Sequence, residues 1–134
     1  MCHPARLIPP ARLIETLEYI TRPKRNTIVL CQSHVGMTGG RQKLTLSSHC
    51  SSTDIRHEIG HLIGLYHHHN RPDRDQYIEI IEDNVNQKKW KNFKKCEKCW
   101  HFGTEYDYRS IMHYKSNAFS SNGLVTMQPL VIRL

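Results

Sequence analysis

The chain has 134 residues, a length that corresponds to one domain of modest size. Hydrophobic residues make up 38% and charged residues 23%, which is close to an ordinary globular composition and argues against a wholly disordered chain. No apolar run approaches the roughly 18 residues that a membrane span needs, so the membrane-spanning class is excluded. The first residues lack the basic start and apolar stretch of a secretory signal peptide.

The N-terminal half contains the most periodic segments. Residues 11–20 carry apolar side chains at helical spacing and predict a short amphipathic helix. Residues 27–31 and 43–46 predict two strands with a glycine-rich turn between them. Residues 51–54 offer several helix N-caps, and the apolar periodicity that follows them predicts a helix as far as Gly64.

The C-terminal half is expected to consist of shorter elements joined by irregular chain. Residues 70–75 predict a polar loop, and residues 77–81 predict a strand or a turn. Residues 86–95 predict a basic helix. From Cys96 onward the chain is predicted to be mostly loop, with a late apolar segment at 124–134.

The segment HEIGHLIGLYH at residues 57–67 carries the most specific chemistry of the sequence. His57 and His61 are four residues apart, so they project from one face of the predicted helix. Gly64 tolerates left-handed backbone and can turn the chain back, which would bring His67 to the same ion as a third ligand. Because His67, His68 and His69 are consecutive, another register of the third ligand is also possible, although the motif spacing favours His67.

Three neutral imidazoles that leave a fourth position open favour zinc, one ion per chain. Zinc lowers the pKa of a bound water from about 15.7 to about 7. Glu58 lies beside the first ligand and is suited to take a proton from that water and to pass it to the leaving amine. These parts predict an endopeptidase that hydrolyses peptide bonds in protein or peptide substrates.

A second segment, SIMHY at residues 110–114, contains Met112, whose side chain can either form the floor of the metal site or pack in a core. HEIGHLIGLYH with NRPDRDQYI after it, together with YDYRSIMHY and the segment from Cys31 to Cys50, resembles the astacin family of zinc endopeptidases in the metzincin clan. The resemblance covers about residues 29–130.

The resemblance implies the roles of the site residues. His57, His61 and His67 would bind zinc, and Glu58 would be the general acid and base. Tyr114 would be a further, switchable zinc ligand whose hydroxyl steadies the oxyanion when substrate is bound.

The resemblance also implies a fold and a cellular location. The fold would be α+β and metzincin-like, with a small twisted sheet and the active-site helix above a cleft and an irregular C-terminal part. Residues 33–36 would form an edge strand to which an extended substrate adds. A disulfide would join Cys31 to Cys50, and the protein would be secreted.

The chain departs from the family pattern at both ends and at one position beside the site. His68 stands where the family usually has glutamate. Residues 1–26 match the family poorly, and the chain stops before the family's C-terminal helix. We therefore expect residues 1–134 to form a single but truncated catalytic domain. The alternative is a catalytically inactive relative that still binds zinc or a partner.

Two further features leave several interpretations open. Cys96 and Cys99 form a C-x-x-C motif, for which a local disulfide is favoured over half of a structural zinc site and over a redox motif. Six lysines and one glutamate fall within residues 88–98 and give that run a charge of +5. Such a run can attract polyanions, but a solvated helix face is favoured and nucleic-acid binding is not expected.

Overall fold

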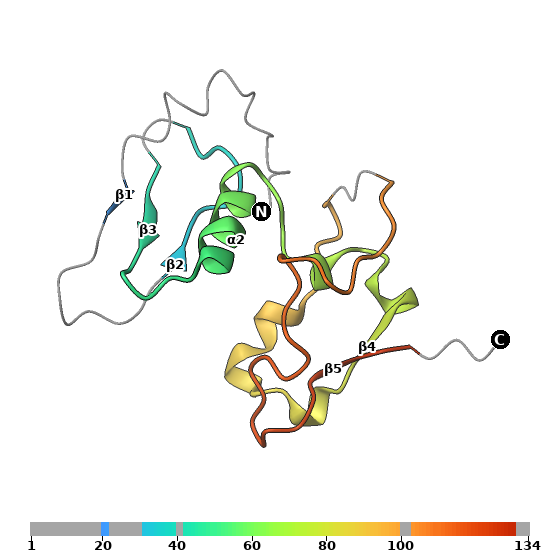
Figure 1. Ribbon diagram of the computed structural model, residues 1–134. Coiled ribbons are helices and arrows are strands. Elements are labelled where there is room, and N and C mark those ends of the chain that lie inside the picture. Colours follow the sequence, from blue (N-terminus) through green and yellow to red (C-terminus); the bar gives the residue numbers. More distant parts are fainter. Residues whose placement is uncertain (1–19, 22–30, 40–41, 100–102, 131–134) are drawn as a thin grey trace. The chain divides into compact units, whose positions relative to one another are not determined.

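The computed structural model describes residues 20–21, 31–39, 42–99 and 103–130, which belong to two compact units, residues 1–66 and 67–134 (Figure 1). Among the described helices, none combines the length and apolarity that crossing a membrane requires. The helix expected at residues 11–20 lies outside the described residues except for Ile20. That residue pairs as a strand, so the helix prediction is wrong at this position.

The first unit contains a mixed three-stranded sheet in the order β1-β3-β2. Strand β1 (Ile20–Thr21) runs parallel to β3 (Leu44–Leu46), and β2 (Cys31–Gln32) runs antiparallel to β3. The predicted strand at 43–46 is confirmed, whereas the strand predicted at 27–31 is described only at its last residue.

The edge strand expected at residues 33–36 does not form. Gly36 adopts a left-handed φ of 68°, and its N–H donates to the His61 carbonyl at 2.8 Å instead of to a neighbouring strand. The described residues 33–36 are therefore irregular chain that ends in a bend after β2.

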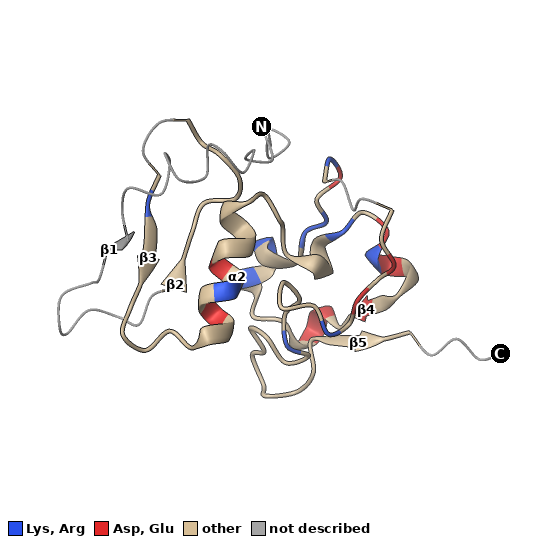
Figure 2. Cartoon of the chain, turned by 45° about the horizontal axis from the view of Figure 1, so that its top comes forward, with Lys and Arg blue, Asp and Glu red and all other residues tan. Residues whose placement is uncertain are grey.

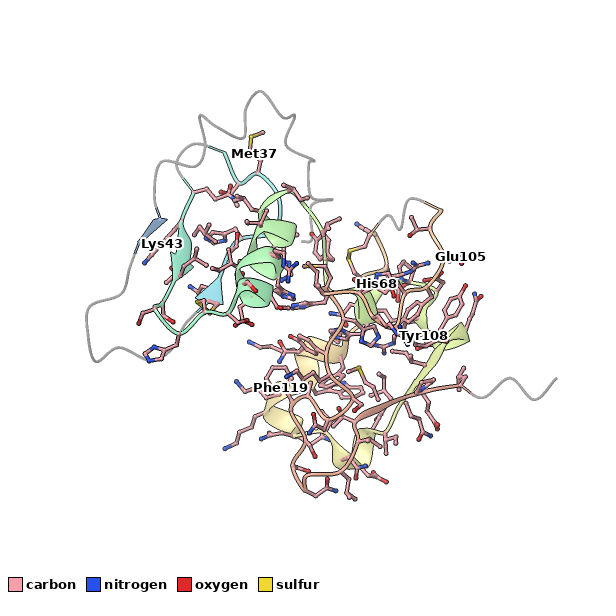
Figure 3. All side chains as sticks on the ribbon, viewed as in Figure 1. Met37, Lys43, His68, Glu105, Tyr108 and Phe119 are labelled. Atoms are coloured by element: carbon pink, nitrogen blue, oxygen red, sulfur yellow. A yellow bond between two sulfur atoms is a disulfide. The ribbon has the colours of Figure 1, made fainter. Side chains whose placement is uncertain are left out.

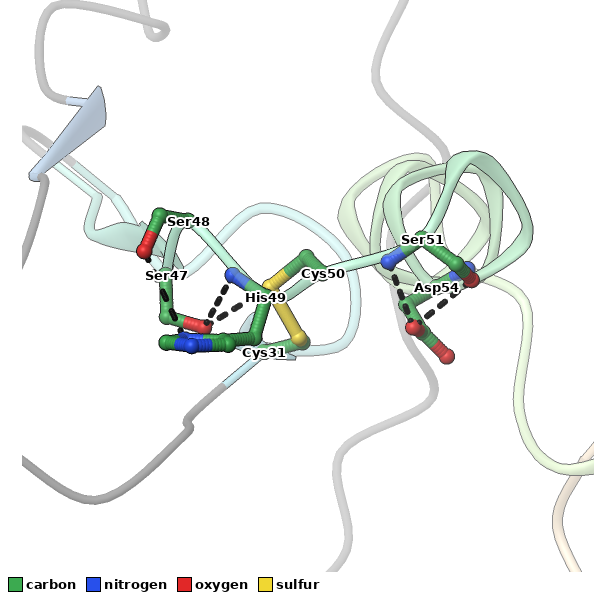
Figure 4. The surroundings of a disulfide bond; sticks show 7 residues. All are labelled: Cys31, Ser47, Ser48, His49, Cys50, Ser51 and Asp54. Carbon is green, nitrogen blue, oxygen red and sulfur yellow. Dashed lines mark hydrogen bonds between the residues drawn. A yellow bond between two sulfur atoms is a disulfide. The ribbon is translucent and has the colours of Figure 1, made fainter.

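Helix α2 (Ser52–Leu62) begins with a complete capping box, as the serine-rich start predicted. The Ser51 hydroxyl accepts from the Asp54 N–H at 3.2 Å, and the Asp54 carboxylate accepts from the Ser51 N–H at 2.8 Å (Figure 4). Cys50, the residue before the N-cap, forms a disulfide with Cys31 in β2. The start of the helix is therefore fixed to the sheet by a covalent bond. At the other end Gly64 has a φ of 107°, which turns the chain away from the helix axis.

The second unit consists of four 3-10 helices and a two-stranded antiparallel sheet within its described part. The sheet pairs β4 (Ile78–Ile80) with β5 (Met127–Pro129), so the segment expected as strand or turn at 77–81 is a strand. The 3-10 helices are η1 (His68–Asn70), η2 (Arg74–Gln76), η3 (Glu82–Asn84) and η4 (Gln87–Phe93).

The predicted basic helix at 86–95 is helical, but it is the 3-10 helix η4. Its tighter winding has a packing reason, because three residues per turn place Trp90 directly above Phe93. Their ring centroids lie 6.1 Å apart with an interplanar angle of 16°. Phe93 is fully buried in the core of this unit, whose buried members are Ile78, Val85, Phe93, Tyr106 and Met127.

The polar loop predicted at residues 70–75 contains two buried arginines. Arg71 donates through both ends of its guanidinium to the Asp73 carboxylate, at 2.9 and 2.7 Å. It also donates to the backbone carbonyls of Thr104 and Glu105, both at 3.0 Å. Arg74 donates to the carbonyls of His69 and Phe93. These bonds hold segments together that lie far apart in the sequence.

Candidate metal centre

Helix α2 positions three of the predicted site residues. His57 and His61 lie one turn apart on it, with ring centroids 4.6 Å apart and nearly perpendicular planes. Glu58 lies between them in sequence and is 6% exposed. The helix that the capping box begins therefore presents two imidazoles and a carboxylate within five residues.

The surroundings of His61 fix which nitrogen is available to a metal. Its Nδ1 lies 2.8 Å from the carbonyl oxygen of Leu65. Because a carbonyl can only accept, Nδ1 carries the proton and Nε2 keeps its lone pair, the state that a metal ligand requires. Burial lowers the pKa of His61, which further favours the neutral ring. Leu65 can reach this position because Gly64 turns the chain after the helix.

Glu58 is a buried carboxylate whose second oxygen is not satisfied by the protein. Within the described part of the chain, its Oε2 has no hydrogen-bond partner. Burial raises the pKa of Glu58, while the neighbouring His57 and the backbone N–H of Ser33 oppose that shift. A buried oxygen of this kind is costly unless it meets a partner such as a water or a substrate group.

The second unit supplies His67 and Tyr114, which contact each other directly. Their ring centroids lie 4.5 Å apart. Tyr114 also stacks on His69 at 4.0 Å with an interplanar angle of 28°. Burial raises the pKa of Tyr114, so its hydroxyl stays protonated and able to donate.

His69 is a supporting residue that sequence reasoning considered only as a competing register of the third ligand. It is fully buried, its Nε2 lies 3.1 Å from the Asn92 carbonyl, and burial lowers its pKa to about 3. The ring therefore stays neutral and acts as a flat surface against Tyr114. The only signal in the sequence was its place in a run of three histidines, which gives no indication of burial.

His68 and Met112 tie η1 to the SIMHY segment. The His68 N–H donates to the Met112 carbonyl at 2.8 Å, and the His68 Nε2 accepts from the Asp107 N–H at 3.0 Å. Figure 3 shows the His68 side chain within the second unit, near the labelled Tyr108. The Met112 side chain is buried, at 3% exposed, and its expected role as a floor of the metal site stays a prediction. His68, which stands where the sequence resemblance leads us to expect glutamate, thus connects η1 to residues 107 and 112 by hydrogen bonds.

The ligand atoms of His57, His61 and His67 all lie within 4.8 Å of one another. Each of the three histidines offers one ring nitrogen, and imidazole nitrogens are common ligands of zinc in proteins. A set of three neutral imidazoles suits zinc, and the unsatisfied oxygen of Glu58 on the same helix suits a base beside it. The residues present therefore fit the metal that the sequence motif predicts.

Comparison with known proteins also indicates a zinc peptidase. The family model described as Astacin, a peptidase family, matches residues 15–133. Zinc metalloproteinase nas-7 of Caenorhabditis elegans is 45% identical over 104 residues, and nas-8 of the same nematode is 45% identical over 100 residues. These alignments cover 75% and 72% of this chain, but only 27% and 25% of those proteins.

A solved structure also resembles the chain. High choriolytic enzyme 1, a hatching-enzyme zinc protease from the medaka fish Oryzias latipes, matches with a TM-score of 0.72 and 35% sequence identity. The match covers 78% of this chain and 54% of that one. The chain spans about a quarter of the length of the nematode relatives that it matches. From the family model, these relatives and the cluster of three histidines, the chain belongs to the astacin family of zinc-dependent peptidases.

Proposed function

We propose that this chain is a zinc-dependent endopeptidase that cleaves peptide bonds in protein substrates. The observation that carries the proposal is the convergence of three imidazoles on one helix and its exit, together with the unsatisfied carboxylate oxygen of Glu58. Membership of a family of zinc peptidases supports it.

His57, His61 and His67 would hold the zinc ion. When bound, zinc would supply the Lewis acidity that activates a water and polarises the scissile carbonyl. Glu58 takes a proton from the attacking water at its Oε2 and delivers it to the nitrogen of the departing amine. Its raised pKa helps it to hold that proton between the two steps.

Tyr114 is proposed as a further zinc ligand and as a donor to the carbonyl oxygen as negative charge develops there. Its contact with His67 and its protonated hydroxyl support this role. The stack with His69 supports one face of the tyrosine ring.

The protein is proposed to act in an oxidising compartment, consistent with secretion. Two disulfides, Cys31–Cys50 and Cys96–Cys99, support this location because such bonds are rare where glutathione keeps thiols reduced. The second pair also favours the local-disulfide interpretation of the C-x-x-C motif over a zinc or redox site.

The test is to measure zinc content and hydrolysis of a quenched casein substrate before and after Glu58→Gln. We expect about one zinc per chain in both proteins and a loss of turnover of about 10²–10⁴-fold in the variant. Glu82→Gln, which neutralises an exposed carboxylate in η3, serves as the control and should leave turnover unchanged. Unchanged turnover in Glu58→Gln would refute the assigned mechanism.

The same experiment separates the alternative, a catalytically inactive relative. The position of His68, which replaces the family's usual glutamate, favours that alternative. A folded parent chain that holds about one zinc but shows no turnover would select the inactive relative.

A further inference from the structure

The lysine-rich segment of the second unit is not used by the proposed peptidase mechanism. Four of its lysines, Lys88, Lys89, Lys91 and Lys94, are exposed on or directly after η4, and we call these four residues the basic ridge. In the part of the chain that the structure describes, none of the four makes an ion pair. A row of cations without acidic partners is available to an external anion.

The 3-10 winding of η4 aligns two of these charges. Side chains three residues apart in such a helix lie one above the other, with a rise of about 6 Å. The 6.1 Å separation of Trp90 and Phe93 agrees with this repeat. Lys88 and Lys91 are also three residues apart, so their side chains lie one above the other on a different side of η4. In an α-helix, which turns by about 100° per residue, Lys88 and Lys91 would instead be offset around the axis by about 60°.

The helix that carries the ridge is firmly anchored. The Asn86 side chain caps its start by accepting from the Lys88 N–H at 3.0 Å, and Phe93 buries its end in the core. After it, the Cys96–Cys99 disulfide closes a tight loop whose Cys96 N–H donates to the Asn70 carbonyl at 2.7 Å. The lysines are thus presented by a fixed backbone, which lowers the entropic cost of binding.

Within the described residues, no carboxylate forms an ion pair with the four lysines of the ridge. Asp75 accepts from Lys95 at 2.8 Å and from Arg74 at 2.9 Å, so it is already neutralised by cations outside the ridge. Glu82 and Asp83 on η3 and Glu97 in the disulfide loop are the remaining acidic groups of this stretch. Figure 2 marks these charges along the chain.

We propose that the basic ridge binds sulfated polysaccharide chains, such as those of the heparin class. Two disulfides favour an oxidising compartment, where sulfated glycans rather than nucleic acids are the abundant polyanions. Phe93 is fully buried, whereas Phe119, which is labelled in Figure 3, is 37% exposed and has the Lys89 ammonium 5.7 Å from its ring centroid.

The experiment measures binding of the oxidised full chain to immobilised heparin over a series of salt concentrations. The variant K88Q/K91Q is compared with K43Q/K115Q, which removes the same charge from two exposed lysines elsewhere in the chain (Lys43 is labelled in Figure 3). We expect the slope of log Kd against log salt to fall by about 2 in the ridge variant, one for each lost contact. The control pair should keep the parent slope, and K88R/K91R should restore it.

Equal losses in K88Q/K91Q and K43Q/K115Q would overturn the proposal, because net charge alone would then explain the binding. Competition by single-stranded DNA as effective as that by heparin would overturn the assignment to sulfated polysaccharide. Zinc content and casein hydrolysis are expected to be the same in parent and ridge variants, so the result does not depend on whether the chain is an active peptidase.

Discussion

Each of the two units is stabilised internally, by interactions that differ in how far apart their partners lie in the sequence. In residues 1–66 the best-defined element is α2, which begins where Ser51 and Asp54 cap each other three residues apart. In residues 67–134 the regular elements are short, and Arg71 reaches backbone carbonyls 33 and 34 residues further along the chain. Local rules therefore shape the first unit, whereas buried polar side chains organise the second.

The difference has a consequence for the candidate site. His57, Glu58 and His61 are placed by helix periodicity, which any capped helix would reproduce. His67 and Tyr114 depend on a stack of rings and on hydrogen bonds between remote segments. We therefore expect single substitutions in the second unit to cost more stability than those in the first.

The largest effect is expected from Arg71→Met. This change removes the buried guanidinium that donates to the Asp73 carboxylate and to two backbone carbonyls, so we expect a loss of about 4 kcal/mol in the free energy of unfolding. Denaturant unfolding followed by tryptophan fluorescence measures it. Arg71→Lys is the matched variant, and it should lose nearly as much because an ammonium cannot reproduce the two-pronged contact. A loss below 1 kcal/mol in both would contradict the role given to this side chain.

The first unit also contains a covalent cross-link, the disulfide between Cys31 and Cys50, which closes a separation of 19 residues. Replacing both cysteines by serine should cost about 3 kcal/mol, because the unfolded chain regains the entropy of an open loop. The paired replacement of Cys96 and Cys99, which are three residues apart, should cost roughly half as much. Thermal unfolding of both variants beside the parent checks the order, and a larger effect for the shorter loop would reject this explanation.

The same contrast explains how much could be predicted from the sequence. The helix around His57 and the strand at 43–46 are confirmed, because caps and alternation are signals read over a few neighbouring residues. The edge strand at 33–36 was wrong, since the Gly36 N–H bonds to the His61 carbonyl, a partner 25 positions away that no local pattern reveals.

In the second unit, the burial of polar side chains was the feature that could least be predicted from the sequence. The segment 70–75 is as polar as a solvated loop, yet Arg71 and Arg74 are only 6% and 7% exposed. His69 likewise gave no sign that it lies against Tyr114. Such placements depend on which remote carbonyls and rings the folded chain brings near, and single-sequence patterns contain no information about them.

A smaller effect is expected from Ser51→Ala at the start of α2. The hydroxyl that accepts from the Asp54 N–H is lost, and a helix cap of this kind contributes about 1 kcal/mol. Ser52→Ala, one residue further on, changes the first helical residue without touching the cap and should be neutral or slightly stabilising. Urea unfolding of the two variants side by side decides whether the capping box, and not serine content, begins the helix.

The smallest effect is expected from Asp75, a half-exposed carboxylate on the surface of the second unit. Its hydrogen bonds with Lys95 and then with Arg74 lower its pKa below the usual value of 3.8. A carboxylate with a lowered folded-state pKa stabilises the protein above its unfolded pKa, and that contribution disappears as the pH falls through the folded value. Asp75→Asn should therefore be slightly less stable than the parent at pH 7, by less than the cap variant, because surface pairs are screened by solvent.

The difference between parent and Asp75→Asn should shrink as the pH is lowered below 3.8, since the parent carboxylate then becomes protonated as well. Acid titration of the unfolding free energy in both proteins measures this convergence. Asp83→Asn, which changes an exposed aspartate of η3 that has no ion pair within the described residues, removes the same charge and serves as the control. A constant difference in unfolding free energy between parent and Asp75→Asn down to the lowest pH would mean that the variant does not act through the charge of this carboxylate.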